Sequence, residues 1–316
     1  MKRIYLIFFA VFVLLLIVIG IYETAGSGTK IPFPAVQKIK TILQKSGKTT
    51  NPSTIYTVVV IMMENKSYSD IVGSPNAPYI NSLIHTYSFA DNYFAVTHPS
   101  LPNYIALLGG NTFGITSDCT DCHVNAANFI DQLEQVNKTW EAYMESIPFP
   151  CFAGSSGKYA QKHDPFLYFD DIRNNAKRCH HIVPYSFLSS DFRSLNSTPH
   201  FAWITPDLCD DMHDCSVQTG DRWLASNVSY ILASPAFTKH KSMLAITWDE
   251  GEGSGSNRVP LLLIGNAVKH GFTSHTSYSH YSLLHTIEQV WHLPPITQAV
   301  SQSKSMTDML LPSLSL

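Results

Sequence analysis

Long apolar runs without alternation mark the candidate strands of this chain. Four such runs are rich in aliphatic and β-branched residues. An unbroken run of this kind is typical of a strand that a parallel sheet buries on both faces. We therefore predict strands at Tyr56–Met63, Phe201–Thr205, Ser242–Trp248 and Val259–Ile264.

Stretches with helical periodicity lie between these strands. Apolar residues spaced three and four apart predict amphipathic helices at Asn125–Val136, Trp223–Leu232 and Ser282–Trp291. Strands that alternate with helices favour an α/β fold with a mostly parallel sheet.

The N-terminus has a different pattern. Lys2 and Arg3 precede an almost unbroken apolar run from Ile4 to Tyr22, which is long enough to cross a bilayer as a helix. We favour an uncleaved anchor, with a cleaved signal at Thr24–Gly26 as the alternative. Either one sends the rest of the chain outside the cytoplasm. The expected parts are an anchor or signal at 1–23, a stalk rich in Lys, Ser, Thr and Pro at 24–53, and one domain at 54–316.

Composition narrows the classes of partner. Hydrophobic residues make up 45% of the chain, which is ample for a buried core, and the formal net charge is only -3. Such a balance offers no basic surface for a polyanion, so we expect no nucleic-acid partner. Charged residues make up only 14%, and this sparse charge suits an acidic exterior.

Six cysteines support an extracytoplasmic location. Cys119 and Cys122 form a C-x-x-C, but no second such pair completes a structural zinc site, so disulfides are the better interpretation. Cys119 with Cys122 and Cys209 with Cys215 are plausible local pairs. The sequence leaves the connectivity open.

Polar residues directly follow three of the four predicted strands. They are Glu64-Asn65, Pro206-Asp207 and Asp249-Glu250. The carboxyl ends of parallel strands meet at one edge of a sheet, where ligands bind. We therefore expect these side chains to converge, and their oxygens are the ligands that a hard divalent cation prefers. Each pair alone is also compatible with an ordinary strand-end turn.

Ser100 and two histidines are further candidates for chemistry. Ser100 lies between Pro99 and Pro102, just before an expected helix start at Ala106–Leu108. It is either a helix cap or a nucleophile activated by a metal. His213 lies in an acidic loop between Cys209 and Cys215, and His280 precedes the last amphipathic helix. Each histidine is either functional or merely structural.

Taken in order, these motifs resemble one family. They are Glu64-Asn65, Asp91-Asn92-Tyr93, Ser100-Leu101-Pro102-Asn103-Tyr104 with Gly109-Gly110, Thr205-Pro206-Asp207 with Asp211-Met212-His213-Asp214, Trp248-Asp249-Glu250, and His280-Tyr281-Ser282-Leu283-Leu284. The set is similar to the phosphoesterase family of bacterial acid phosphatases and phospholipases C, within the alkaline-phosphatase-like superfamily. The resemblance covers roughly Thr54 to Leu293.

The resemblance implies a fold, a reaction and a set of site residues. It implies a three-layer α/β/α sandwich that hydrolyses phosphate esters through a phosphorylated serine, with Ser100 as the nucleophile. It implies a divalent metal of unknown identity held by Glu64, Asn65, Ser100, Asp249 and Glu250. Asn103 would contact the phosphoryl group, and His213 and His280 would lie near the leaving group. Asp207 stands where relatives often have Asn and is a secondary candidate.

The substrate class stays open between two phosphate esters. The chain ends soon after its last predicted helix, whereas phospholipases C of this type tend to carry additional C-terminal domains. This favours a phosphomonoesterase acting on a small molecule. An N-terminal anchor, which would place the site near phospholipid head groups, keeps the phospholipase C alternative open. A catalytically inactive binding protein on the same scaffold is the third alternative.

Overall fold

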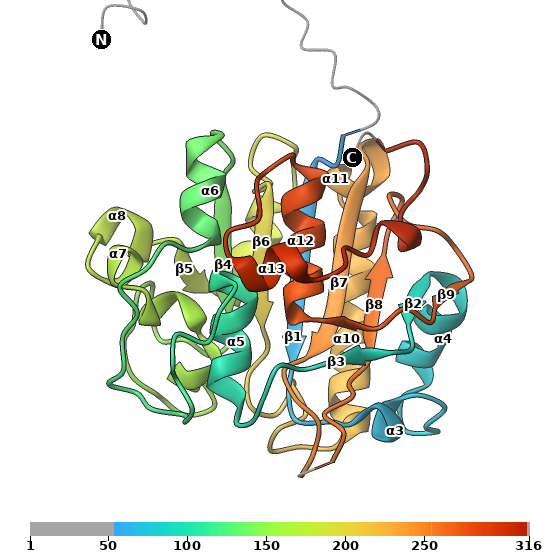
Figure 1. Ribbon diagram of the computed structural model, residues 1–316, viewed down its shortest axis with the longest axis horizontal. Coiled ribbons are helices and arrows are strands. Elements are labelled where there is room, and N and C mark those ends of the chain that lie inside the picture. The colour runs from blue at the N-terminus through green and yellow to red at the C-terminus, as the bar shows by residue number, and fades with distance from the viewer. Residues whose placement is uncertain (1–53, 254, 315–316) are drawn as a thin grey trace, which may run out of the picture. The chain divides into compact units, whose positions relative to one another are not determined.

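The computed structural model describes residues 54–253 and 255–314, and a mixed sheet organises them (Figure 1). Its strand order is β5-β4-β6-β1-β7-β8-β2-β9, and β10 pairs with β3 in a separate ribbon. The strands are β1 (Thr57–Met63), β2 (Ser88–Ala90), β3 (Tyr93–Phe94), β4 (Trp140–Met144), β5 (Ile182–Pro184), β6 (Phe201–Thr205), β7 (Ser242–Trp248), β8 (Leu261–Ile264), β9 (Phe272–Ser274) and β10 (Tyr278–Ser279).

Strand β1 lies at the centre of the sheet. It runs parallel to β6 on one side, with Val58 opposite Phe201, and parallel to β7 on the other, with Thr57 opposite Ser242. Every residue of β1 is buried. The unbroken apolar pattern therefore has the cause that we predicted, since both faces of this strand are covered.

Strand β8 departs from the parallel arrangement. It is antiparallel to β7 and to β2. The described residues between β7 and β8 form no helix, and a parallel neighbour would require a crossover connection, usually helical. β8 is the one predicted strand without a polar pair at its end, and its carboxyl end lies at the opposite edge of the sheet from those of β1, β6 and β7.

Helices cover both faces of the sheet (Figure 1). Helices α5, α6, α12 and α13 pack with one another on one face, whereas α4, α10 and α11 lie on the other. The helices are α3 (Tyr68–Ile71), α4 (Pro78–Thr86), α5 (Ser100–Gly109), α6 (Phe129–Gln135), α7 (Asp170–Arg173), α8 (Ala176–Cys179), α9 (Leu188–Asp191), α10 (Val217–Ala233), α11 (Pro235–Lys239), α12 (His280–Val290) and α13 (Gln298–Gln302). Four short 3-10 helices are η1 (Gln161–His163), η2 (Pro165–Tyr168), η3 (Tyr185–Phe187) and η4 (Thr307–Met309).

Three disulfides bind the loops. Cys119–Cys122 and Cys209–Cys215 are the two local pairs that the sequence made plausible, and Cys151–Cys179 joins the loop after β4 to α8. Disulfides form and persist in oxidising compartments, so these bonds indicate an extracytoplasmic protein.

The predicted anchor or signal at 1–23 and the stalk at 24–53 lie outside the described residues. Within residues 54–253 and 255–314, no helix combines the length and the apolar character that a membrane crossing needs.

Candidate active site

The candidate site forms at the carboxyl ends of three adjacent strands. Glu64 and Asn65 follow β1, the loop from Pro206 follows β6, and Asp249 follows β7. The loop after β6 lies over the end of β1, because the Glu64 amide donates to the carbonyl of Asp211 at 2.9 Å. Of the three strand-end pairs that we expected to converge, Glu64-Asn65 and Asp249-Glu250 do so, whereas the Asp207 side chain does not join them.

Ser100 faces this acidic edge from the first residue of α5. Its Oγ lies 3.2 Å from Glu64 Oε2, 3.3 Å from Asn65 Oδ1 and 3.3 Å from Glu250 Oε1. The side chain is 1% exposed. Four of the five residues that the resemblance assigns to the metal therefore meet at one hydroxyl oxygen.

Asp249 is the fifth residue of this set, and Asn65 holds its side chain in place. Its Oδ1 accepts from the backbone amide of Asn65 at 3.1 Å. Asn65 has a φ of 35°, in the left-handed region that asparagine tolerates better than most residues. This turn aims the Asn65 amide at Asp249 while its side-chain oxygen faces Ser100.

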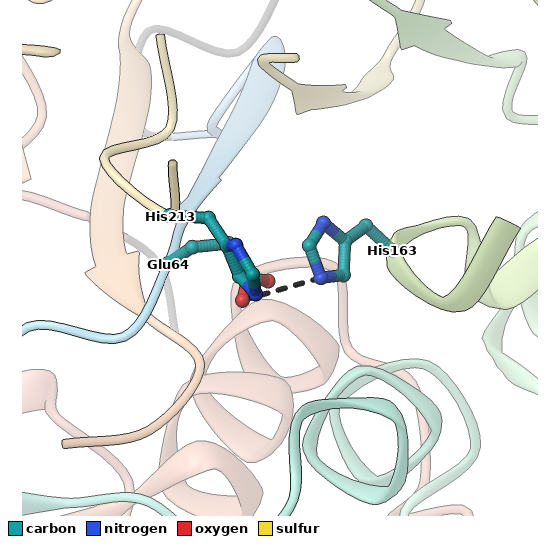
Figure 2. Close-up of side chains that lie close together, drawn as sticks. All are labelled: Glu64, His163 and His213. Atoms are coloured by element: carbon teal, nitrogen blue, oxygen red, sulfur yellow. Dashed lines mark ion pairs between the residues drawn. The ribbon is translucent and has the colours of Figure 1, made fainter. Parts of the chain in front are cut away.

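Two histidines also lie beside Glu64 (Figure 2). His163, from η1, has Nε2 3.3 Å from Glu64 Oε2 and Nδ1 3.5 Å from Asp211 Oδ2. His213 contacts Asp214 through Nδ1 at 2.7 Å. Figure 2 shows His163, from η1, and His213, from the loop after β6, lying close to the Glu64 carboxylate. Glu64, His163 and His213 together offer three ligand atoms within 4.8 Å of one another.

Burial and mutual repulsion shift the acids of the site. Burial first, and then the charges of Asp249 and Asp211, hold the pKa of Glu64 well above its usual range. Burial and the neighbouring Glu250 raise the pKa of Asp249 to about 7. Burial is also the main reason that the pKa of Asp211 rises to about 9. Such carboxylates are costly to ionise together without a compensating cation.

Unsatisfied atoms indicate where such a cation fits. Asp249 Oδ2, Asp211 Oδ2 and His163 Nε2 are buried, and none has a hydrogen-bond partner among the described residues. Buried polar atoms are normally paired. The donor set is chemically appropriate as well, because carboxylate and amide oxygens with imidazole nitrogens bind divalent metals.

The structure gives Asn103 partners other than the phosphoryl group that the resemblance implies. Its Oδ1 accepts from the amides of Val96 and Thr97 at 2.9 and 3.0 Å, and its Nδ2 donates to the carbonyls of Thr97 and Pro99 at 2.9 and 3.0 Å. An asparagine side chain has two donors and an oxygen with two lone pairs. All are therefore in use, fixing the loop that leads to Ser100.

His280 also lies behind the site rather than on the leaving-group side. It is fully buried, with Nε2 2.8 Å from the carbonyl of Asp249 and Nδ1 2.8 Å from the hydroxyl of Tyr93. Asp207 similarly supports its own loop, because it accepts from the amides of Cys209 and Asp210 and from Ser146 Oγ at 2.7 Å. Of these secondary candidates, only His213 lies beside Glu64.

Several site residues escaped prediction from the sequence. His163 and Lys162 lie in η1, which begins well after the end of β4, so the strand-end rule does not find them. Tyr104 donates to Glu64 Oε1, and His98 Nδ1 contacts Glu250 Oε2. Tyr104 belongs to the motif that carries the resemblance, and it lies one helical turn after Ser100 in α5; this spacing was a signal that the two side chains share a face.

The chain has clear relatives among known proteins. It matches the Phosphoesterase family over residues 74–294. It is 36% identical over 256 residues to the phosphatidylinositol-3-phosphatase of Mycobacterium tuberculosis, covering 80% of this chain and 82% of that protein. It is 30% identical over 251 residues to an acid phosphatase of Aspergillus fumigatus, covering 75% of this chain and 55% of that protein. The chain thus spans about half the length of this fungal relative.

Solved structures agree on the fold. A Vibrio parahaemolyticus protein in the alkaline phosphatase superfamily has a TM-score of 0.55 at 11% identity, covering 81% of this chain and 72% of that one. At this identity the likeness shows the fold alone. It confirms the predicted α/β architecture, with a mostly parallel sheet between layers of helices.

Proposed function

The chain belongs to the Phosphoesterase family, and we propose that it is a metal-dependent phosphomonoesterase whose nucleophile is Ser100. Family membership makes it a hydrolase of phosphate esters, so the inactive binding protein is no longer an alternative. The observation that carries the proposal is the position of Ser100 Oγ, within 3.3 Å of Glu64, Asn65 and Glu250.

Relatives favour a monoester over the diester that a phospholipase C would cleave. The mycobacterial and fungal relatives are both named phosphatases, and a phosphatase removes a terminal phosphate. We infer that the substrate is a phosphomonoester, carried by a small molecule or by a phospholipid head group.

The residues that would hold the metal are those around the serine. We assign Glu64, Asn65, Ser100, Asp249 and Glu250 to this role, and the unpaired Oδ2 of Asp249 supports the assignment. Such an ion, when bound, polarises the phosphoryl group and stabilises the serine alkoxide. The raised pKa values of Glu64 and Asp249 describe the site without that charge.

The protein's own groups perform the proton and bond exchanges. Ser100 Oγ attacks phosphorus while its proton passes to the carboxylate of Glu64 or Glu250. The bond from phosphorus to the leaving oxygen breaks, and His213 donates a proton to that oxygen. In the second step, water attacks phosphorus and gives a proton to His213, while the serine oxygen leaves and takes back its proton from the carboxylate, so that phosphate is released and the hydroxyl is restored. His280 acts as a positioning residue, holding the backbone of Asp249.

Replacement of Ser100 tests the proposal. We expect Ser100→Ala to lower the turnover of p-nitrophenyl phosphate by about a thousandfold or more, because the variant lacks the oxygen that attacks phosphorus. Ser242→Ala is the matched control. Ser242 is also a buried serine, but it is the first residue of β7 and donates to the carbonyl of Ala236. Near-normal activity in Ser100→Ala, with a folded protein, would show that another group attacks phosphorus.

Metal removal tests the second half of the proposal. Dialysis against a chelator is expected to abolish turnover, and one divalent metal should restore it. Elemental analysis of the purified protein measures how many ions are bound. Full activity in metal-free protein would overturn the assignment.

We also propose that residues 1–23 tether the enzyme to the membrane. The long apolar run after Lys2 and Arg3 supports this. Fractionation of cells expressing the full chain would place a tethered enzyme with the membranes, and a cleaved one in the medium or periplasm.

A further inference from the structure

Lys162 is a cation at an otherwise acidic site. It lies in η1, next to His163, and its Nζ contacts Asp118 Oδ2 at 3.0 Å and His213 Nε2 at 3.5 Å. Its side chain is 23% exposed, so it is partly buried and still in contact with solvent. It thus contacts the histidine that borders Glu64.

The Lys162 ammonium is fixed from two directions. Gln161, the preceding residue, donates to the carbonyl of Thr120 at 2.9 Å and thereby holds η1 in place. Asp118 accepts from Lys162 with one oxygen and from the backbone amide of Leu101 with the other, at 3.0 Å. The Lys162–Asp118 pair is therefore attached to the first turn of α5, directly beside Ser100.

An ammonium group has three N–H donors. Asp118 takes one, and the contact with His213 is long, so the group retains capacity to bind an anion. One divalent metal offsets only two of the three carboxylate charges of Glu64, Asp249 and Glu250, so a phosphomonoester dianion gains from a further cation here. A lysine beside the first turn of α5 can bind a phosphoryl oxygen as a point charge.

We propose that Lys162 binds a non-bridging oxygen of the substrate and sets the preference for phosphomonoesters over phosphodiesters. A monoester brings two negative charges and three such oxygens. A diester replaces one of these oxygens with an ester oxygen and carries a single negative charge, so it gains less from the ammonium. This inference rests on the proposed monoesterase function.

The test compares two esters with the same leaving group. The kcat/KM of the full chain, loaded with its restoring metal, is measured on p-nitrophenyl phosphate and on bis(p-nitrophenyl) phosphate. We expect Lys162→Gln to lower the monoester value about 100-fold and the diester value by less than about fivefold. Lys162→Arg keeps the charge and is expected to retain most of the monoester preference. Equal losses on both esters would overturn the role of Lys162.

A double variant separates anion binding from simple neutralisation of Asp118. If Lys162 served only to balance that carboxylate, Lys162→Gln combined with Asp118→Asn would recover the monoester activity. We expect no recovery, and also a weaker inhibition by inorganic phosphate in both variants. Recovery, or unchanged phosphate inhibition, would contradict the proposal. These variants and Lys162→Arg keep the test open if Lys162→Gln alone folds poorly.

The outcomes distinguish this inference from the proposed function. A wild-type enzyme that prefers the diester would overturn the monoesterase proposal itself. A wild-type enzyme that prefers the monoester, with the same preference in Lys162→Gln, would overturn only the role of the lysine.

Discussion

At the scale of single residues, Tyr104 controls the carboxylate on which the site converges. Its hydroxyl donates to Glu64 Oε1, and its ring stacks on His163 with centroids 5.4 Å apart. Tyr104 is fully buried. The tyrosine therefore leaves the other oxygen of Glu64 turned toward Ser100.

Removal of the Tyr104 hydroxyl should weaken the site more than the fold. We expect Tyr104→Phe to bind the restoring metal about tenfold more weakly, because residues that orient a ligand contribute this much. The unfolding free energy should fall by about 1 kcal/mol. Metal titration of turnover measures the first effect, and chemical denaturation measures the second.

Tyr143→Phe is the matched control for this change. Tyr143 is also buried and donates to a carboxylate, Asp191, at 2.9 Å, but it lies on β4 away from the metal set. Equal metal affinity in the two variants would show that Tyr104 does not orient Glu64.

The acidic half of the site was predictable from the sequence, and the histidine half only partly so. Strand geometry carries Glu64 and Asp249 to one edge, and the order of the motifs adds Ser100. His163 reaches Glu64 from a short 3-10 helix. The position of this helix depends on tertiary packing, and its sequence is too short to show a periodic pattern of apolar residues. For Asn103 the sequence falls short in another way. The motif identifies the residue, but it does not reveal the hydrogen-bond partners of its side chain.

At the scale of elements, the end of α5 explains the Gly109-Gly110 motif. A Cβ at Gly109 would lie 2.7 Å from atoms of Phe113 and Phe169. Gly110 has a φ of 70°, and a Cβ there would lie 2.8 Å from side-chain atoms of Ile296 and Val300. Thr297 also donates to the carbonyl of Gly110 at 2.7 Å. The helix that begins with Ser100 is thus fixed against α13 at its other end.

Alanine at Gly110 should therefore destabilise the domain strongly. We expect Gly110→Ala to lower the unfolding free energy by about 3 kcal/mol, from a strained φ and a clash with α13. Gly114→Ala is the control, because Gly114 has a similar φ of 78° but a Cβ added there would meet no atom within 4 Å. It should cost only about 1 kcal/mol. Thermal or chemical unfolding measures both changes. If the two variants lost similar amounts of unfolding free energy, the clash with α13 would make no contribution to the loss at Gly110.

The four central strands, β6, β1, β7 and β8, were predictable, whereas the strands on either side of them were not. β6 and β7 have the predicted bounds, and β1 and β8 begin one and two residues later than predicted. β4 escaped because Glu141 interrupts its apolar residues, and β2 and β9 are only three residues long. Short strands are stabilised by their neighbours, so their own residues carry little signal. The direction of β8 likewise depends on the connection, not on the strand's composition.

At the scale of the whole molecule, some buried carboxyl groups are distant from the proposed metal. Glu288, on α12, accepts from the amide of Ile296 at 2.8 Å and is fully buried. Burial raises the pKa of Glu288 to about 7. The folded protein therefore holds a proton on this group at a pH where the unfolded chain has released it.

This shift predicts a more stable fold in mild acid. The contribution of Glu288 is complete below its unfolded pKa, near 4.5, and is lost as the pH rises through about 7. We expect this group to lower the unfolding free energy by about 2 kcal/mol between pH 5 and pH 8. Chemical denaturation across this range should show the slope, and Glu288→Gln should reduce it.

An exposed acid gives the comparison. Glu252, whose side chain is 62% exposed and pairs with Lys66, should leave the slope nearly unchanged when replaced by Gln. If Glu288→Gln kept the wild-type slope, proton uptake by the folded state would have to lie elsewhere. A fold that is more stable in mild acid agrees with the acidic exterior that we inferred from the low content of charged residues.

The central position of β1 has a consequence for biosynthesis. This strand comes first in the described domain, but its two neighbours begin at Phe201 and Ser242. A ribosome must therefore make most of the chain before the first strand has a partner on either side. During that interval an apolar segment that carries Glu64 stays unpaired, and it is prone to aggregation. A chain that leaves the cytoplasm through a channel can cross it in the unfolded state. With this topology, the central part of the sheet is completed only after β7 has passed through the channel.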